Sequence, residues 1–471
     1  MLLTMLYYAN KSYMKKLLPS FLILSALLSA DAFAQTDSAM FRKIFNEALS
    51  NGKSYSNLDY LTNKIGGRLS GSPEAQKAVD WAFKAMKEAG ADTVYLQECM
   101  VPHWVRGQKE VGKVITSNSK GIKEVPVCAL GGSVATPAEG LSANVIEVMG
   151  LEGLKDLKKE DVKGKIIFFN EPMDPTLIET FHAYGKAVEQ RWAGASAAAE
   201  YGAVAVIVRS CTLLQDDNPH TGVMGYKDSI TKIPACAIST NAANWLSTYL
   251  RTDKDLKFFL KMNCETLPDE KSYNVVGEVW GSEKKNEYIV VGGHLDSWDT
   301  GKGAHDDGAG VVQSIEVLRI FKAAGIRPKR TIRAVAFMNE ENGGRGGKKY
   351  AELAKLKNEK HVAAIESDAG GFSPRGFSSD VTPEVKAKLK SWRALFEPYG
   401  IYSFEHDGSG SDIGPLRKDG VPCMELMPDS QRYFDYHHTP IDTFDAVNKR
   451  ELELGGAAMA AMVWMISQYG L

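Results

Sequence analysis

The segment from Tyr288 to Ser297 reads YIVVGGHLDS and decides the fold. Its first five residues are apolar or small, as in a strand that is buried on both faces of a sheet. His294 and Asp296 follow directly, so an imidazole and a carboxylate lie where this strand ends. Open α/β sheets bind their ligands at the carboxyl ends of the strands. The segment therefore predicts an α/β fold with a functional site at one edge of the sheet.

The same alternation of strand and helix runs through the second half of the chain. Short apolar runs predict strands over residues 274–279, 288–292, 331–338, 361–365 and 421–426. Helices are expected over residues 309–324, 345–356, 382–398 and 450–468. The N-terminal part adds helices, among them one from Ala75 to Ala89, and a strand at 95–99. This order predicts a mixed, largely parallel sheet between two layers of helices.

The chain changes character between residues 106 and 262. Short buried strands are expected there over residues 145–148, 165–169, 203–208 and 233–238. None of the ligand motifs described below falls in this range. We therefore interpret it as a small, β-rich inserted domain. The catalytic domain would then consist of residues 35–105 and 263–471.

Residues 1–34 have the pattern of a secretory signal peptide. Two lysines precede the apolar run Leu17–Leu28, and Ala32-Phe33-Ala34 forms a small-residue cleavage site. The run is shorter than the roughly 20 apolar residues of a spanning helix, which favours cleavage over a membrane anchor. We expect a secreted or periplasmic protein whose translation starts at Met1 or Met14.

The composition is that of an ordinary globular protein. The 471 residues carry a formal net charge of −2, so the basic surface of a nucleic-acid-binding protein is not expected. The six cysteines form no Cys-x-x-Cys pair, and their even number fits either disulfides or buried free thiols. The apolar run from Gly455 to Ile466 is too short to span a membrane and predicts a helix packed in the core.

Two motifs next to the first strand are candidate metal ligands. His294 is suited to bind zinc, and Asp296 is expected to accept the other N–H of its ring and so fix the tautomer. Asp306-Asp307 lies among small residues just before a helix. One of these carboxylates is expected to bridge two metals about 3.5–4 Å apart. Taken singly, a His-x-Asp pair more often lies in a surface loop, and an acidic doublet more often caps a helix.

Three further motifs complete the set. Glu340-Glu341 follows a buried strand, where two acids are costly unless they are paired or bind metal. One of them is expected to bind metal while its neighbour takes a proton from water. Asp368 follows the next strand, and His438 comes near the end of the chain. Structural zinc sites are closed and rich in cysteine, whereas this imidazole and carboxylate set leaves positions open for water and substrate.

These motifs resemble the zinc aminopeptidase and glutamate carboxypeptidase superfamily, most closely its plasma glutamate carboxypeptidase (carboxypeptidase Q) type. The resemblance covers residues 40–471. It rests on Gly293–Asp299, Gly303–Gly308, Glu366–Gly370, His437-His438 with Asp442-Thr443, and Gly67–Ser72. It implies a three-layer α/β/α zinc-peptidase domain, a protease-associated domain inserted at residues 106–262, and a homodimer.

The resemblance also assigns roles to the candidate residues. It implies two zinc ions, each held by one imidazole and one carboxylate and joined by a shared carboxylate. The expected ligands are His294 and Asp368 for one ion, Glu341 and His438 for the other, and Asp306 as the bridge. The peptide bond from Asp306 to Asp307 is often cis in such proteins. Glu340 is expected to be the general base, which accepts a proton from water and then passes it to the leaving amine.

One part of the family pattern is missing. Several relatives support the oxyanion with a Tyr shortly before a Ser-Asp-His motif. Here the stretch His406–Ile413 contains no Tyr, and Ile413 stands in place of the His. His406, in a glycine-rich loop, is a candidate for that role. The alternatives are an ordinary loop or core histidine, with zinc alone polarising the carbonyl.

The sequence thus predicts a di-zinc metallopeptidase that hydrolyses dipeptides or short peptides at a free terminus, and it leaves open which terminus. The expected partners are a peptide substrate and a second copy of the chain, without nucleic acid or, after signal cleavage, membrane. One alternative is a glutaminyl cyclase, a single-zinc acyltransferase of this fold that usually lacks the second Asp of the doublet. Another is a receptor-like relative without catalysis. The complete ligand set argues against both.

Overall fold

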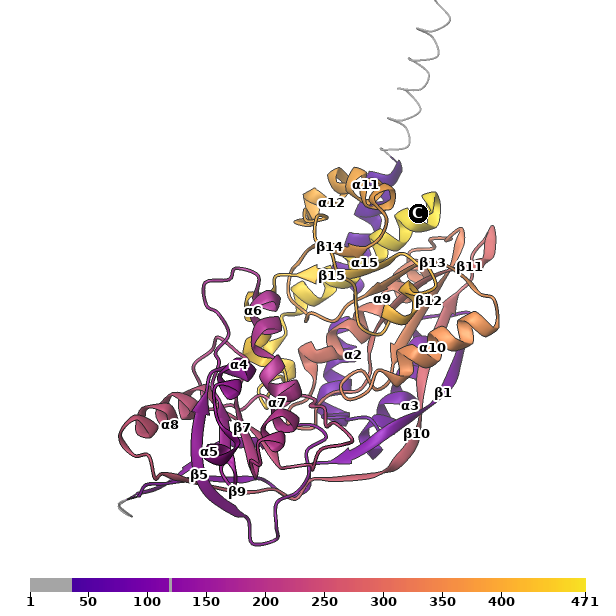
Figure 1. The fold of residues 1–471 in the computed structure, drawn as a ribbon. Helices are drawn as coiled ribbons and strands as arrows, with labels where there is room; N and C mark the ends of the chain where they lie inside the picture. The colour runs from indigo at the N-terminus through magenta and orange to yellow at the C-terminus, as the bar shows by residue number, and fades with distance from the viewer. Residues whose placement is uncertain (1–35, 118–120) are drawn as a thin grey trace, which may run out of the picture.

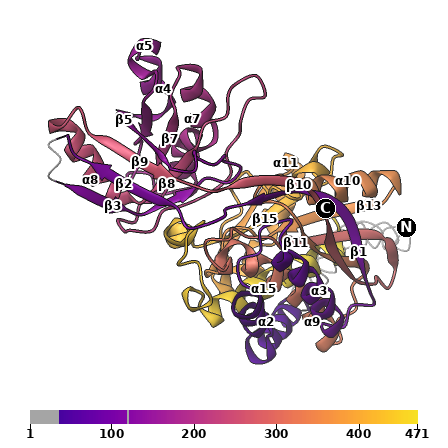
Figure 2. The same ribbon diagram turned by 90° about the horizontal axis from the view of Figure 1, so that it is seen from below.

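The computed structural model describes residues 36–117 and 121–471, which form two lobes (Figure 1). The predicted signal peptide lies outside these residues. The larger lobe contains a seven-stranded sheet and the smaller lobe an eight-stranded one. Strands β1 (Thr93–Val105) and β10 (Glu265–Val279) pair antiparallel along their length and form a ribbon between the lobes (Figure 2).

The larger sheet has the order β1-β10-β12-β11-β13-β15-β14. Strands β12, β11, β13 and β15 are parallel. Strands β10 and β14 pair antiparallel with the two outer strands of this group, and β1 pairs antiparallel with β10. The remaining strands are β11 (Lys284–His294), β12 (Arg330–Phe337), β13 (Lys360–Glu366), β14 (Pro374–Asp380) and β15 (Cys423–Pro428). The predicted mixed, largely parallel sheet is confirmed. Strand β14 was not predicted because its sequence, PRGFSSD, lacks the apolar run that marks a strand.

Helices cover both faces of this sheet. Alternate residues of β11 show the two faces, since Ile289 and Val291 pack in one apolar core and Val290 in another. The first core includes a helix over residues 36–51 and α3 (Pro73–Glu88), α9 (Ala309–Ala323) and α15 (Lys449–Tyr469). The second includes α10 (Arg345–Leu356) and α13 (Gly414–Arg417). The three-layer architecture is therefore confirmed.

Local signals explain where several helices begin and end. The Ser72 side chain accepts a hydrogen bond from the Ala75 N–H and so caps α3. Helix α2 (Ser54–Tyr60) continues as a π-helical turn, Leu61–Ile65. The helix expected over residues 382–398 is instead divided into α11 (Pro383–Ser391), α12 (Arg393–Phe396) and a 3-10 turn, Glu397–Tyr399. Pro398 lacks the N–H that a continuing α-helix requires.

The smaller sheet has the order β3-β2-β9-β5-β6-β7-β8-β4, with β5 to β8 parallel. Its strands are β2 (Val111–Ile115), β3 (Ile122–Val125), β4 (Val127–Ala129), β5 (Leu141–Val148), β6 (Ile166–Phe169), β7 (Ala205–Arg209), β8 (Ala235–Ile238) and β9 (Lys257–Lys261). All of them lie within the predicted insertion. Five helices accompany them, so this lobe is mixed rather than simply β-rich: α4 (Gly150–Lys155), α5 (Lys159–Val162), α6 (Thr180–Ala187), α7 (Glu189–Glu200) and α8 (Thr240–Thr252).

Two expectations about membranes and cysteines have clear outcomes. In the part of the chain that the structure describes, no helix is long and apolar enough to cross a membrane. The apolar C-terminal run lies within α15, which is largely buried, as predicted. All six cysteines are described, and each is a buried free thiol.

Helices α9 and α15 approach each other closely at Gly455. A Cβ at this position would lie 2.1 Å from Nε2 of Gln313 on α9. Gln313 is fully buried and cannot swing out, because its amide bonds the Ser367 hydroxyl and the Leu452 carbonyl. The glycine therefore sets the distance between the two helices.

We predict that Gly455→Ala lowers the free energy of unfolding by about 1–3 kcal/mol, because overpacking a rigid interface is destabilising. Gly185→Ala on α6 is the matched control, since nothing lies within 4 Å of a Cβ there. It should be neutral or slightly stabilising. Urea denaturation of both variants would measure the difference, and equal midpoints would contradict this account of the α9–α15 contact.

Candidate metal centre

The predicted ligands meet at the carboxyl ends of the parallel strands. His294 is the last residue of β11, Glu341 follows β12, and Asp368 follows β13. The strands are in parallel register, with Gly293 beside Ala336 and Gly292 beside Glu366, so their ends lie at one edge. Asp306 precedes α9, which packs on the same strands.

The first group of ligands surrounds His294. Its Nε2 lies 3.1 Å from Oδ1 of Asp306 and 3.3 Å from Oδ1 of Asp368. These three residues each offer an atom within 4.8 Å of the others, as a metal requires. Burial by itself would lower the pKa of His294, but the charge of Asp368 and the hydrogen bond with Asp306 raise it well above its usual value.

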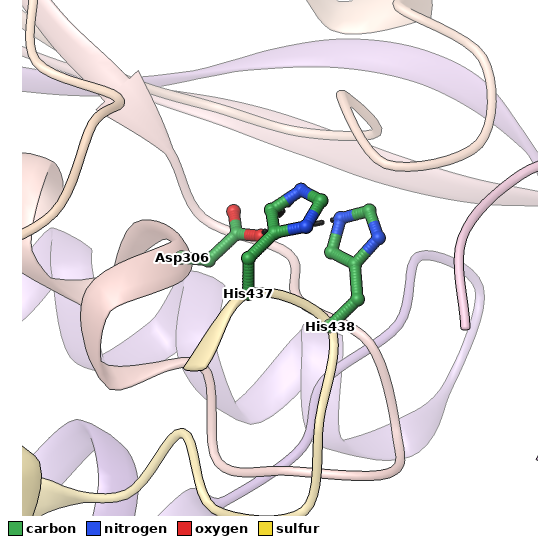
Figure 3. A group of neighbouring side chains, drawn as sticks. All are labelled: Asp306, His437 and His438. Carbon is green, nitrogen blue, oxygen red and sulfur yellow. Dashed lines mark ion pairs between the residues drawn. The ribbon is translucent and has the colours of Figure 1, made fainter. Parts of the chain in front are cut away.

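The second group surrounds His438. Its Nε2 lies 3.1 Å from Oε2 of Glu341 and 3.2 Å from Oδ2 of Asp306. Asp306 thus turns one oxygen toward His294 and the other toward His438. Figure 3 shows His437 beside His438, with Nε2 of His437 3.8 Å from Oδ2 of Asp306. Since His437 also belongs to a group with metal-ligand spacing, it is a second histidine at this position, to which the sequence analysis gave no role.

The donors fit divalent cations in charge and in space. Oδ2 of Asp306 and Oδ1 of Asp368 are buried. They lie near the ring nitrogens of His438 and His294 but form no well-aligned hydrogen bond among the described residues. A cavity of about 10 Å³, the size of one water or ion, is lined by Asp306, Glu341 and His438. Burial, followed by the charge of Asp306, raises the pKa of Glu341 to about 8. Cations placed among these carboxylates would remove that penalty.

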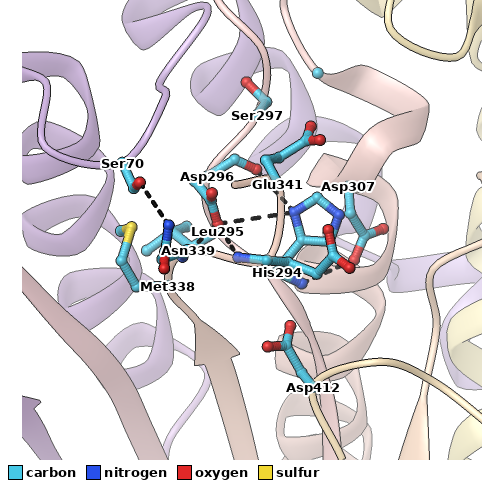
Figure 4. Close-up of polar contacts among 12 residues, drawn as sticks. Ser70, His294, Leu295, Asp296, Ser297, Asp307, Met338, Asn339, Glu341 and Asp412 are labelled. Carbon is cyan, nitrogen blue, oxygen red and sulfur yellow. Dashed lines mark hydrogen bonds and ion pairs between the residues drawn. The ribbon is translucent and has the colours of Figure 1, made fainter. Parts of the chain in front are cut away.

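Asp296 differs from its expected role. Nδ1 of His294 is 2.9 Å from the backbone oxygen of Asp296, whereas the carboxylate is 3.9 Å away. The carboxylate instead accepts the backbone N–H groups of Asn339 and Glu340, at 2.7 and 3.1 Å (Figure 4). The sharp turn after His294 brings the carbonyl closer to the ring than the side chain. Asp296 therefore positions the loop that carries Glu340, while its carbonyl orients His294.

A second layer of acids holds the Asp306 segment. Oδ2 and Oδ1 of Asp307 accept the N–H groups of His294 and Gly310, and the two oxygens of Asp442 accept those of His305 and Asp306. The peptide bond from Asp306 to Asp307 is cis, as the resemblance implied. Burial raises the pKa of Asp442 to about 7. Asp307 and Asp442 thus bind backbone and position the bridging residue.

Arg68, from the N-terminal Gly-Arg-Leu-Ser motif, fixes the loop between β11 and α9. Its guanidinium is fully buried and donates to the carbonyls of Leu295, Lys302 and Gly303 at 2.6–3.0 Å. The backbone N–H of Arg68 donates to the Ser297 hydroxyl. The planar guanidinium therefore binds both ends of the loop from Leu295 to Gly303, which separates the candidate ligands His294 and Asp306.

The smaller lobe contributes to the same centre. The Thr221 carbonyl lies 3.2 Å from Nδ1 of His438, and the Thr221 N–H donates to the His438 carbonyl. Arg106, at the junction of the lobes, pairs with Asp299 at 2.7 Å. A carbonyl acceptor for the second ring nitrogen fixes the orientation of a histidine ligand. The segment from 106 to 262, in which we expected no ligand, thus orients the candidate ligand His438.

Glu340 lies next to this centre and is half-buried. Its charge acts on Asp368, whose pKa is raised to about 6, first by burial and further by the neighbouring acids Asp306 and Glu340. Its backbone is held by Asp296, as described above. Glu340 thus lies beside the cluster without belonging to either group of candidate ligands among the described residues.

The structure separates two candidates for the oxyanion. His406 is half-buried and lines a cavity next to Ala369, outside both ligand groups. Tyr433, which the sequence analysis did not single out, is buried near the ligands. Burial and the charges of Asp306 and Asp368 raise the pKa of its hydroxyl well above the usual value. Its signal in the sequence was only its place five residues before His438.

Comparisons with known proteins agree with a metal-dependent hydrolase of this fold. The model of peptidase family M28 matches residues 274–463. The chain is 37% identical to carboxypeptidase Q of Xenopus laevis, over 88% of this chain and 85% of that protein. A crystal structure of a peptidase M28 precursor from Shewanella amazonensis superimposes with a TM-score of 0.87 and 36% identity, over 92% of this chain and 97% of the other.

A zinc aminopeptidase of Bacillus subtilis shares the fold, with a TM-score of 0.63 and 22% identity over 88% of this chain and 95% of that one. The match to the family model and the two relatives at 36–37% identity show that the chain belongs to peptidase family M28. The family resemblance seen in the sequence is confirmed, and the protein is an enzyme of the zinc-dependent exopeptidase class.

We predict that Arg68→Lys lowers the free energy of unfolding by about 2–4 kcal/mol, because one ammonium cannot satisfy the carbonyls that the guanidinium bonds. Arg393→Lys is the control, since Arg393 forms an exposed pair with Glu397 on α12. Denaturant titration would measure both variants. A fully stable Arg68→Lys protein would contradict the role of the buried guanidinium.

We also predict that removal of divalent metal by a chelator lowers the Tm and that added zinc restores it. The buried carboxylates repel one another without cations, and zinc at about 100 times its Kd would add about 2.7 kcal/mol. Calorimetric unfolding during a zinc titration would measure this. Identical Tm values with and without zinc would contradict a metal centre.

Proposed function

We propose that this protein is a di-zinc exopeptidase that hydrolyses dipeptides or short peptides. The observation that carries the proposal is the orientation of Asp306, whose two oxygens face two separate imidazole–carboxylate pairs. This arrangement suits a bridging ligand of a two-metal hydrolase. Zinc follows from the mixture of imidazole and carboxylate donors and from the zinc aminopeptidase that shares the fold.

Five residues would hold the two ions. These are His294 and Asp368 on one side, Glu341 and His438 on the other, and Asp306 between them. His437 lies close enough to compete with His438, but His438 has the shorter contacts, with both Asp306 and Glu341. When bound, two zinc ions lower the pKa of water and stabilise negative charge on the scissile carbonyl.

Glu340 carries the proton in this proposal. It lies beside the ligands, and its backbone is fixed by Asp296, so its carboxylate is positioned to accept a proton from the attacking water. The same carboxyl group would then donate that proton to the leaving amine. Tyr433 is buried beside Asp306 and Asp368 and is better placed than His406 to donate a hydrogen bond to the developing oxyanion.

The relatives support action at a peptide terminus but differ in polarity, since they include carboxypeptidase Q and the aminopeptidase YwaD of Bacillus subtilis. We propose cleavage of substrates with a free terminus in a secreted or periplasmic setting, after removal of residues 1–34. The protease-associated identity of residues 106–262 and a homodimer remain predictions. Sedimentation of the mature chain would test the homodimer.

We predict that Glu340→Gln lowers kcat by at least about 100-fold, because the proton acceptor is lost, while about two zinc ions per chain remain bound. Glu341→Gln is the matched comparison, since it should lose zinc together with activity. Metal analysis and turnover of a dipeptide panel, with N- and C-terminally blocked peptides, would measure both. An active Glu340→Gln enzyme would refute the assignment, and release of ammonia from an N-terminal Gln peptide without hydrolysis would favour a cyclase.

A further inference from the structure

A second cavity, of about 200 Å³, lies beside the metal centre. Ala369, the residue after the proposed ligand Asp368, forms part of its wall. Strands β14 and β15 contribute Ser378, Glu425 and Met427, and the smaller lobe contributes Phe181 on α6. One water needs only roughly 10–15 Å³, so this space has room for a side chain. Its place next to the centre suits a part of the substrate that adjoins the scissile bond.

The sheet fixes Glu425 at this cavity. Side chains of a strand alternate between its faces. Met424 and Leu426 of β15 are buried in the apolar core on one side, whereas Glu425 and Met427 line the cavity on the other. Ser378 of β14 lies directly across from Glu425 and lines the cavity as well. The position of Glu425 therefore comes from strand pairing and not from a loop.

Glu425 has no hydrogen-bond or ion-pair partner within residues 36–117 and 121–471. Glu366, beside it on β13, shows the contrast, because its carboxylate accepts the N–H groups of Asp412 and Ile413 at 3.3 and 3.0 Å. Burial, followed by the charges of Asp368 and Glu366, raises the pKa of Glu425 well above its usual value. The Glu425 side chain is half-buried. A carboxylate that is partly withdrawn from water without a partner is destabilised, and a cation from outside would relieve that cost.

The rest of the cavity suits a long side chain with a charged end. Phe181 and Met427 provide apolar wall, which can cover a methylene stem. Asp407 at the rim is already paired with Lys386. No lysine or arginine is among the residues that line the cavity. The Lys386 ammonium is held at the rim by Asp407 and the His406 carbonyl. A cationic group of the substrate therefore has a free acceptor at Glu425.

We propose that this cavity binds a lysine or arginine side chain of the peptide substrate, with Glu425 as the residue that determines this specificity. The proposal rests on the proposed peptidase function, which it extends to a substrate class. The ammonium or guanidinium lies against the Glu425 carboxylate, and the stem packs on Phe181 and Met427.

The test measures kcat/KM of the zinc-loaded enzyme for four dipeptides, Lys-Ala, Met-Ala, Ala-Lys and Ala-Met. Methionine has a similar length without charge. We expect a preference for lysine of about 10- to 100-fold at one of the two positions, the size of one charge-assisted hydrogen bond. Glu425→Gln should abolish this preference, because it should lower kcat/KM far more for the lysine peptide than for the methionine peptide. Glu352→Gln, at an exposed position on α10, is the control and should behave as the wild type.

Binding to the Glu340→Gln enzyme tests the cavity independently of turnover. Calorimetry should show tighter binding of the lysine dipeptide than of its methionine counterpart, and the added Glu425→Gln change should remove the difference. Equal binding of the two would overturn the proposal. An equal loss for lysine and methionine peptides in Glu425→Gln would also overturn it, since Glu425 would then bind the α-ammonium group or act on the structure. If the Glu340→Gln enzyme binds the lysine dipeptide selectively but the zinc-loaded wild-type enzyme hydrolyses no dipeptide, the result would support the cavity and contradict the proposed function.

Discussion

The constraint that governs this structure is the electrostatic repulsion among the carboxylates that cluster around the buried Asp306. Asp306, Asp307, Glu341 and Asp368 come from three segments and lie within a few residues of strand ends or helix starts. Their mutual repulsion in a low-dielectric setting is offset in part by His294 and His438, whose pKa values are raised in turn. Cations bound in the proposed centre would complete the balance. The fold therefore has to hold against a repulsion that only the occupied site removes.

Backbone hydrogen bonds provide much of that hold. Asp296, Asp307 and Asp442 use their oxygens to bind N–H groups of the loops that carry the ligands. Arg68 binds carbonyls of the same region with a single guanidinium. These residues position the candidate ligands and Glu340 through the backbone. A parallel sheet suits this design, because it delivers several loops to one edge while its helices bury the rest.

The smaller lobe contacts residues of the candidate metal centre and of the neighbouring cavity. Thr221 orients the ring of His438. Trp298 donates its backbone N–H to the Glu341 carboxylate, and its indole ring packs against Gly131 of the smaller lobe. Phe181 reaches the cavity of Glu425. The orientation of the candidate ligand His438 and the proposed substrate contact thus depend on both lobes.

The sequence by itself determined the strand and helix order of the larger lobe, the family and the residues proposed as ligands, because apolar periodicity and local motifs are written in neighbouring residues. It also indicated Glu340 as the base. Tertiary structure alone decided that the Asp296 carboxylate binds the Asn339 loop, that Thr221 orients His438, that Tyr433 and His437 adjoin the centre, and that Glu425 faces a cavity without a partner. These relations join residues far apart in the chain through strand register and lobe contact, which no local pattern encodes. The polar strand β14 escaped prediction for the same reason, since only its pairing with β15 defines it.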